Sequence, residues 1–106
     1  MLAEKQSMKM VKMDTIMKNM LILALGDVMR EEKKKGGDPK TPSSLILKLD
    51  ATPEGKLFLE EEEYRLVICA LNKLRDTYLA KGRYSDGIDK ILYKILRAKY
   101  RKCAVR

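Results

Sequence analysis

Two amphipathic helices are encoded in residues 60–101, which read EEEEYRLVICALNKLRDTYLAKGRYSDGIDKILYKILRAKYR. Side chains three and four positions apart share one face of an α-helix. Apolar residues follow this spacing in the first half, at Tyr64, Val67, Ile68, Leu71, Leu74 and Tyr78. They follow it again in the second half, at Ile88, Ile91, Leu92, Ile95 and Leu96. The pattern therefore predicts one helix over residues 60–80 and another over residues 86–102.

The connection between these helices is short. Gly82 suits the left-handed position just after a helix end, and Ser85 or Asp86 can accept amide hydrogens at the start of the next helix. Because residues 81–85 cannot carry the chain far, the two apolar faces are expected to meet in an antiparallel αα-hairpin.

Length and composition indicate one domain, residues 1–106. The chain is 45% hydrophobic and 36% charged, which is typical of a folded and soluble protein. Its longest purely apolar run, residues 20–25, is far shorter than the roughly 20 residues of a membrane span. The start does not resemble a signal peptide, and two cysteines form no disulfide framework. We therefore expect a cytoplasmic protein that makes no membrane contact, with Cys69 as an ordinary buried thiol.

Residues 1–35 are expected to form one long methionine-rich helix that ends at Gly36. Met10, Met13, Met17 and Met20 recur at heptad-like spacing, which is typical of a helix–helix seam. Methionine fills gaps in protein cores, and residues 1–12 could be a frayed lead. The alternative is an adaptable interface with a partner or with a second copy, and this seam is the basis for predicting a homodimer.

Residues 36–59 are expected to be a linker followed by short strands. Two glycines and two prolines disfavour a helix over residues 36–44. Leu45, Leu47 and Leu49 alternate along a short strand pattern, a turn follows at residues 52–55, and residues 56–59 could return as a second strand. A β-hairpin and an irregular apolar arm are both compatible with this pattern. The predicted fold is thus mainly α, with three helices and this element between the first and second.

The residue inventory excludes several chemistries. There is no histidine, which removes imidazole bases and the commonest metal ligand. Two distant cysteines cannot build a four-ligand zinc site, and no glycine-rich phosphate loop is present. Consecutive carboxylates at residues 60–63 point around a helix rather than toward one centre, so a solvated first turn is expected. We therefore expect no enzyme activity, no cofactor and no bound metal.

The net charge of +8 is concentrated near the end of the chain, where residues 81–106 hold nine Lys or Arg against two acids. The candidate partner-binding or nucleic-acid-binding residues are Lys90, Tyr93, Lys94, Arg97, Lys99, Tyr100, Arg101 and Lys102. A basic stripe with interleaved tyrosines can neutralise phosphates and stack on bases. The same pattern also describes the solvated face of an ordinary helix. The hairpin does not match a DNA-binding helix-turn-helix, because its first helix and its connection are too long.

Residues 57–68, LFLEEEEYRLVI, and residues 82–92, GRYSDGIDKIL, carry a resemblance. Together they resemble the C-terminal helical hairpin of small accessory proteins of phages and mobile elements of Gram-positive bacteria. The resemblance covers residues 57–98 and implies a regulator or inhibitor, of which anti-defence proteins that block a host nuclease complex are one kind. It transfers no functional residue, and the methionine-rich first segment has no counterpart in it.

The function expected from these residues is a non-catalytic binding or regulatory protein that covers a surface of another macromolecule. A protein or nucleoprotein target is favoured by the absence of a sequence-reading motif. Direct nucleic-acid binding through the basic C-terminal helix is the alternative.

Overall fold

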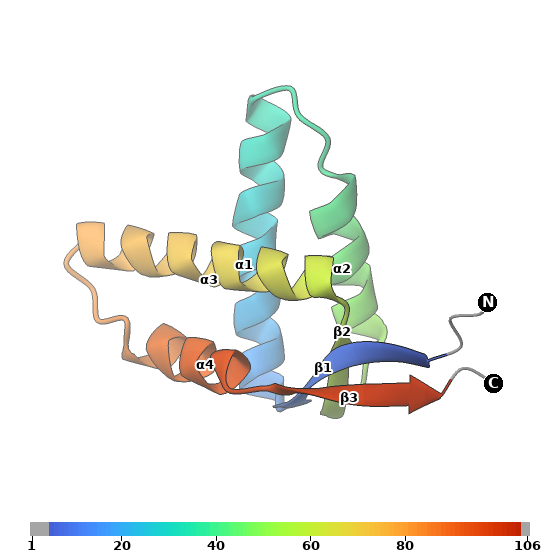
Figure 1. Ribbon diagram of the computed structural model, residues 1–106. Coiled ribbons are helices and arrows are strands. Elements are labelled where there is room, and N and C mark those ends of the chain that lie inside the picture. The colour runs from blue at the N-terminus through green and yellow to red at the C-terminus, as the bar shows by residue number, and fades with distance from the viewer. Residues whose placement is uncertain (1–4, 105–106) are drawn as a thin grey trace.

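Within residues 5–104, the computed structural model contains four α-helices and one three-stranded antiparallel sheet (Figure 1). Side chains are described for residues 8–98. The elements in chain order are β1 (Lys5–Met13), α1 (Thr15–Lys34), α2 (Lys40–Ala51), β2 (Gly55–Leu59), α3 (Glu61–Ala80), α4 (Asp86–Leu96) and β3 (Lys99–Ala104). The expectation of a mainly helical fold is confirmed, although the described part has one helix more than predicted.

The sheet joins the beginning, the middle and the end of the chain. Its strand order is β2-β1-β3, so β1 is central and pairs antiparallel with both neighbours. Alternate residues of a strand point to opposite faces of the sheet. Val11 and Met13 on β1 and Leu57 and Leu59 on β2 are accordingly buried, and Lys12 between the first two is exposed.

The predicted helix over residues 1–35 is wrong in its first third. Residues 5–13 form β1, and α1 begins only after Asp14, whose side chain accepts a hydrogen bond from the Met17 backbone N at 2.8 Å. Asp is a favoured residue at this capping position because its carboxylate satisfies an otherwise unpaired amide. The apolar residues of this segment fit both the spacing of a helix and the alternation of a strand. Pairing with two distant strands decides in favour of the strand.

The methionine seam is therefore not a helical seam. Met10 and Met13 belong to β1, whereas Met17 and Met20 belong to α1. Met13 and Met17 are buried in the core, and Met10 and Met20 are half-buried. The structure agrees with the expectation that methionine fills core gaps for Met13 and Met17.

The predicted linker over residues 36–44 is wrong from Lys40 onward, and the predicted short strand over residues 45–49 is also wrong, because residues 40–49 lie within α2. Pro42 stands in the first turn of this helix, where its missing amide removes no hydrogen bond that the helix would otherwise make. Leu45 and Leu49 share the buried face, and Leu47 is 70% exposed. The expected return strand is present as β2, but it pairs with β1 and not with residues 45–49.

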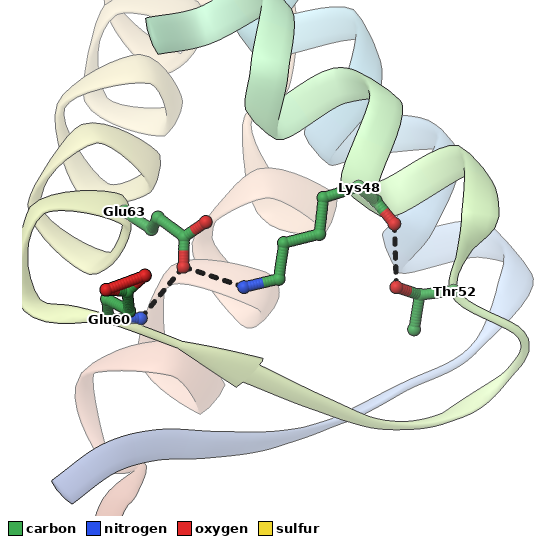
Figure 2. A network of polar contacts seen from close by, with 4 residues as sticks. All are labelled: Lys48, Thr52, Glu60 and Glu63. Atoms are coloured by element: carbon green, nitrogen blue, oxygen red, sulfur yellow. Dashed lines mark hydrogen bonds and ion pairs between the residues drawn. The ribbon is translucent and has the colours of Figure 1, made fainter. Parts of the chain in front are cut away.

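Polar contacts fix α2 and α1 against α3. Figure 2 shows Glu63 of α3 accepting hydrogen bonds from the Lys48 side chain at 2.7 Å and from the Glu60 backbone N at 2.9 Å. On the other side, Lys73 of α3 donates to Glu31 of α1 at 2.8 Å. Glu63 is thus a half-buried structural residue, and the expectation of a solvated first turn applies to the exposed Glu60, Glu61 and Glu62.

The helical hairpin is present, with a shorter second helix than predicted. Its turn begins at Gly82, whose φ of 72° places it in the left-handed region. The Gly82 N donates to the Leu79 carbonyl and the Arg83 N donates to the Tyr78 carbonyl, which are the two hydrogen bonds of a Schellman motif. α3 and α4 then run side by side in opposite directions (Figure 1).

The two faces of α2 give a test of its helical state. Leu49→Ala is expected to lower the free energy of unfolding by about 2–5 kcal/mol, because it leaves a cavity in the core. The matched variant Leu47→Ala should change it by less than about 0.5 kcal/mol. Both are measured by urea denaturation. Equal losses at the two positions would mean that they share a face, as in a strand.

Candidate macromolecular interface

Helix α4 has one buried face and one cationic face. Ile88, Ile91, Leu92 and Ile95 are buried, as their spacing predicts. Four of the candidate binding residues are exposed on the opposite side: Lys90, Tyr93, Lys94 and Arg97. The structure therefore places these cations in solvent, on the face that the sequence assigned to them.

The other half of the predicted basic stripe does not belong to this helix. α4 ends at Leu96, and Arg97 is its C-cap. Lys99, Tyr100, Arg101 and Lys102 lie on β3, and their side chains are outside the described residues. The predicted helix to residue 102 is therefore wrong at its end, because six residue pairs between β1 and β3 hold this segment extended.

Tyr93 and Arg97 form a small polar cluster at the end of α4. The Arg97 guanidinium lies 5.3 Å from the centre of the Tyr93 ring, and its Nη1 donates to the Tyr93 hydroxyl at 3.3 Å. A cation at this distance from an aromatic ring is attracted by the ring's negative face. Tyr93 is 62% exposed, so this pair contributes an aromatic surface next to the lysines.

A hollow of about 290 Å³ lies where β1 leaves the sheet for α1, β2 begins and α4 passes alongside. It is lined by Lys12, Met13, Asp14, Gly55, Lys56 and Lys94. Lys12 and Lys56 are direct partners in the β1–β2 register. The sheet thus places two lysines from distant parts of the chain beside a lysine of α4.

A second hollow of about 360 Å³ lies between the first turn of α1 and the side of α4. It is lined by Asp14, Ile16, Met17, Gly87, Lys90, Ile91 and Lys94. The two hollows share Asp14 and Lys94, so they adjoin. We call the combined feature the lysine groove: its cations are Lys12, Lys56, Lys90 and Lys94, its acid is Asp14, and its exposed apolar residue is Ile16.

Hydrogen bonds from the preceding turn anchor the wall of the lysine groove. A carboxylate oxygen of Glu54 accepts from the Thr15 backbone N at 2.8 Å and from the Thr15 hydroxyl at 2.6 Å. These two hydrogen bonds hold the pKa of Glu54 below its ordinary value, and the bond from the Thr15 hydroxyl has the larger effect. Lys18 donates to the carbonyls of Asp50 and Thr52 at the end of α2. The turn that leads into β2, and so to Lys56, is thereby tied to the start of α1.

Asp89 fixes α4 against α3. The Arg75 Nε donates to one carboxylate oxygen of Asp89 at 2.6 Å, and the Ser85 hydroxyl donates to the other at 3.0 Å. Hydrogen bonding to Arg75, followed by that to Ser85, holds the pKa of Asp89 below its ordinary value of 3.8. Ser85 is buried and precedes the helix, but its hydroxyl serves Asp89 rather than a free amide.

Sequence reasoning missed half of the lysine groove. The sequence pattern predicts a long helix at Lys12 and a short strand at Lys56, and nothing in the local sequence pairs the two. Only the strand register brings them together. Cys69 was also misplaced, since its side chain is exposed beside the buried face of α3 and not within it.

Comparisons with protein-family models, with curated proteins and with solved structures find no match for this chain. Among the described residues, no group of three or more Cys, Asp or Glu side chains is placed to hold a metal ion. No helix in that part of the chain has the length and apolar character needed to cross a membrane.

The Asp89 contacts predict a pH-dependent stability. Because its folded-state pKa is lowered, the ionised carboxylate stabilises the folded protein above pH 3.8, and this contribution is lost as pH falls through the folded-state pKa. Asp89→Asn should therefore be less stable than the wild type at neutral pH, with a difference that shrinks below pH 3.8. Denaturation curves at several pH values measure it.

The control is Asp86→Asn, which removes the same charge from the same first turn of α4. It should leave the acid dependence of the wild type in place. If Asp89→Asn and Asp86→Asn shift stability equally at every pH, only helix-end electrostatics are at work and the contacts to Arg75 and Ser85 contribute nothing.

Proposed function

We propose that this protein is a non-catalytic binding protein that acts by covering a surface of another macromolecule. The observation that carries the proposal is the exposed cationic face of α4, continued by Lys12 and Lys56 across the end of the sheet. The contact surface consists of this face together with the lysine groove. The missing histidine and the residue inventory favour contact over catalysis.

The pairing pattern of the charges supports this proposal. Three other cations form ion pairs that connect helices: Lys48 pairs with Glu63, Lys73 with Glu31, and Arg75 with Asp89. Within the described side chains, no ion pair is formed by Lys12, Lys56, Lys90 or Lys94. Like charges that remain exposed and close together raise the local potential and attract an anionic partner.

A protein target is favoured over a nucleic acid. The lysine groove contains no arginine, whose planar fork matches phosphate oxygens, and no aromatic ring on which a base could stack. It does contain exposed apolar surface at Ile16, which a phosphate backbone would not cover. Apolar surface rimmed by charge is typical of protein–protein contact sites.

Direct nucleic-acid binding is the second candidate, and the Tyr93–Arg97 pair favours it. An exposed aromatic ring beside a guanidinium combines a stacking surface with a phosphate ligand. These two residues lie on the same exposed face of α4 as Lys90 and Lys94.

Two narrower expectations remain proposals. The role of a phage or mobile-element inhibitor rests on the resemblance of residues 57–98 alone. The homodimer stays a prediction, but Met13 and Met17 can no longer supply its interface, because both lie in the core of the protomer.

A pull-down from the native host, repeated after nuclease treatment, tests for a protein target. The wild-type protein should retain its partner after the nucleic acid has been removed. Lys90→Glu with Lys94→Glu should lose it. The control is Lys33→Glu with Lys34→Glu, which changes the same charge at the far end of α1 and should retain the partner. A partner that disappears with the nucleic acid would refute a direct protein contact.

The nucleic-acid alternative predicts a steep salt dependence. If the protein binds duplex DNA directly, its affinity should fall by about tenfold or more between about 50 and 200 mM salt, because bound phosphates release counterions. Arg97→Glu with Lys94→Glu should abolish binding. Fluorescence anisotropy with a labelled duplex measures both. If the affinity for duplex DNA changes neither with salt nor with the two substitutions, this alternative is wrong.

A further inference from the structure

We propose that the lysine groove binds an acidic amphipathic segment of a partner protein. This inference rests on the proposed function and narrows it to one site and one ligand chemistry. The segment would place an apolar side chain against Ile16 and carboxylates against Lys12, Lys56, Lys90 and Lys94. The groove follows α4 from Gly87 to Lys94, about 10 Å at the rise of an α-helix, which fits a segment of about two helical turns.

The charge of the groove selects an acidic ligand. Four lysines and one carboxylate line the two hollows. The carboxylate, Asp14, accepts a hydrogen bond from the Met17 backbone N, caps α1 and forms no ion pair with a described lysine, so the lining keeps an excess of positive charge. A ligand that brings carboxylates would lower the repulsion among Lys12, Lys56 and Lys94, which line one hollow together.

The apolar surface of the groove selects an amphipathic ligand. Ile16 stands in the first turn of α1 and is 75% exposed, although the next residue, Met17, is buried. Ile91 closes the other wall from α4. An amphipathic helix recognises such a site by laying one apolar face into the groove and keeping its charges at the rim. A uniformly acidic chain would leave Ile16 in water.

The acidic run of a second copy is a weaker candidate for the same site. In residues 60–63, Glu61 bonds to Arg65 and Glu63 to Lys48 within the same chain. Of the apolar residues that directly precede this run, Leu57 and Leu59 are buried in the core and Phe58 is half-buried.

The test uses the ¹⁵N-labelled chain of residues 1–106 and a designed peptide with Leu on one helical face and Glu on the other. A scrambled peptide of the same composition and an all-Glu peptide are the controls. NMR titration should shift the amide signals of Ile16, Lys90 and Lys94. The amphipathic peptide should bind at least about tenfold more tightly than either control, which is the discrimination expected when both apolar and charged contacts are made.

Two variants locate the binding. Ile16→Ser, and Lys90→Gln with Lys94→Gln, should each weaken peptide binding by about tenfold or more. These side chains are exposed, so both variants should fold. The matched controls are Leu23→Ser, an exposed apolar residue farther along α1, and Lys33→Gln with Lys34→Gln. Both controls should change the affinity by less than about twofold.

Several results would overturn the inference. Equal binding of all three peptides would mean simple charge attraction, and no binding at about 1 mM peptide would mean that the groove takes no such ligand. Displacement of the peptide by duplex DNA at equal concentration would assign the groove to nucleic acid. Concentration-dependent self-association that Ile16→Ser abolishes would assign it to a second copy.

The failure of this inference can be told apart from the failure of the proposed function. If the nuclease-resistant partner is retained by Ile16→Ser and by Lys90→Gln with Lys94→Gln, the protein contact stands and the lysine groove is not its site. If no nuclease-resistant partner exists, the proposed function itself fails.

Discussion

The pairing of β1 with two strands from distant parts of the chain is the constraint on which the rest of this structure depends. β2 lies more than forty residues further on, and β3 lies at the other end of the chain. Residues 5–10 of β1 pair with β3 and residues 9–13 pair with β2, so neither neighbour can be removed without exposing backbone polar groups of β1. The same strand contributes Val11 and Met13 to the core, which links sheet formation to helix packing.

This pairing also creates the candidate interface. The register sets Lys12 opposite Lys56, and the chain then turns into α1 at Asp14, beside α4. The stabilising contacts and the candidate binding surface use different cations. Lys48, Lys73 and Arg75 hold helices together, whereas the lysines of the groove remain exposed. Four lysines without an ion pair among the described side chains line the groove, and like charges gathered in this way raise the local positive potential.

The sequence predicted those parts of the fold that are set by local periodicity. The faces of α3 and α4, the left-handed Gly82 and the exposure of Lys90 and Lys94 all follow from spacing within a few residues.

Prediction from the sequence failed where pairing between distant segments decides the conformation. Residues 5–13 and 99–104 both carry patterns that fit a helix, yet each is a strand because the other is available to pair with it. The Leu45, Leu47 and Leu49 alternation misled in the opposite direction. Leu45 and Leu49 are also four positions apart on one face of a helix, and Leu47 lies exposed on the other side. The lysine groove depends on that same long-range pairing, which explains why only its α4 half was found.

Amide hydrogen exchange of β1 measured by NMR tests this account most directly. If β1 is the central strand, its hydrogen-bonded amides over residues 9–13 should exchange as slowly as those in the middle of α1 and α3, because opening them requires the sheet and the core to come apart. Fast exchange throughout β1 while α1 and α3 stay protected would contradict the account, since the sheet that positions Lys12 and Lys56 would then not be part of the stable fold.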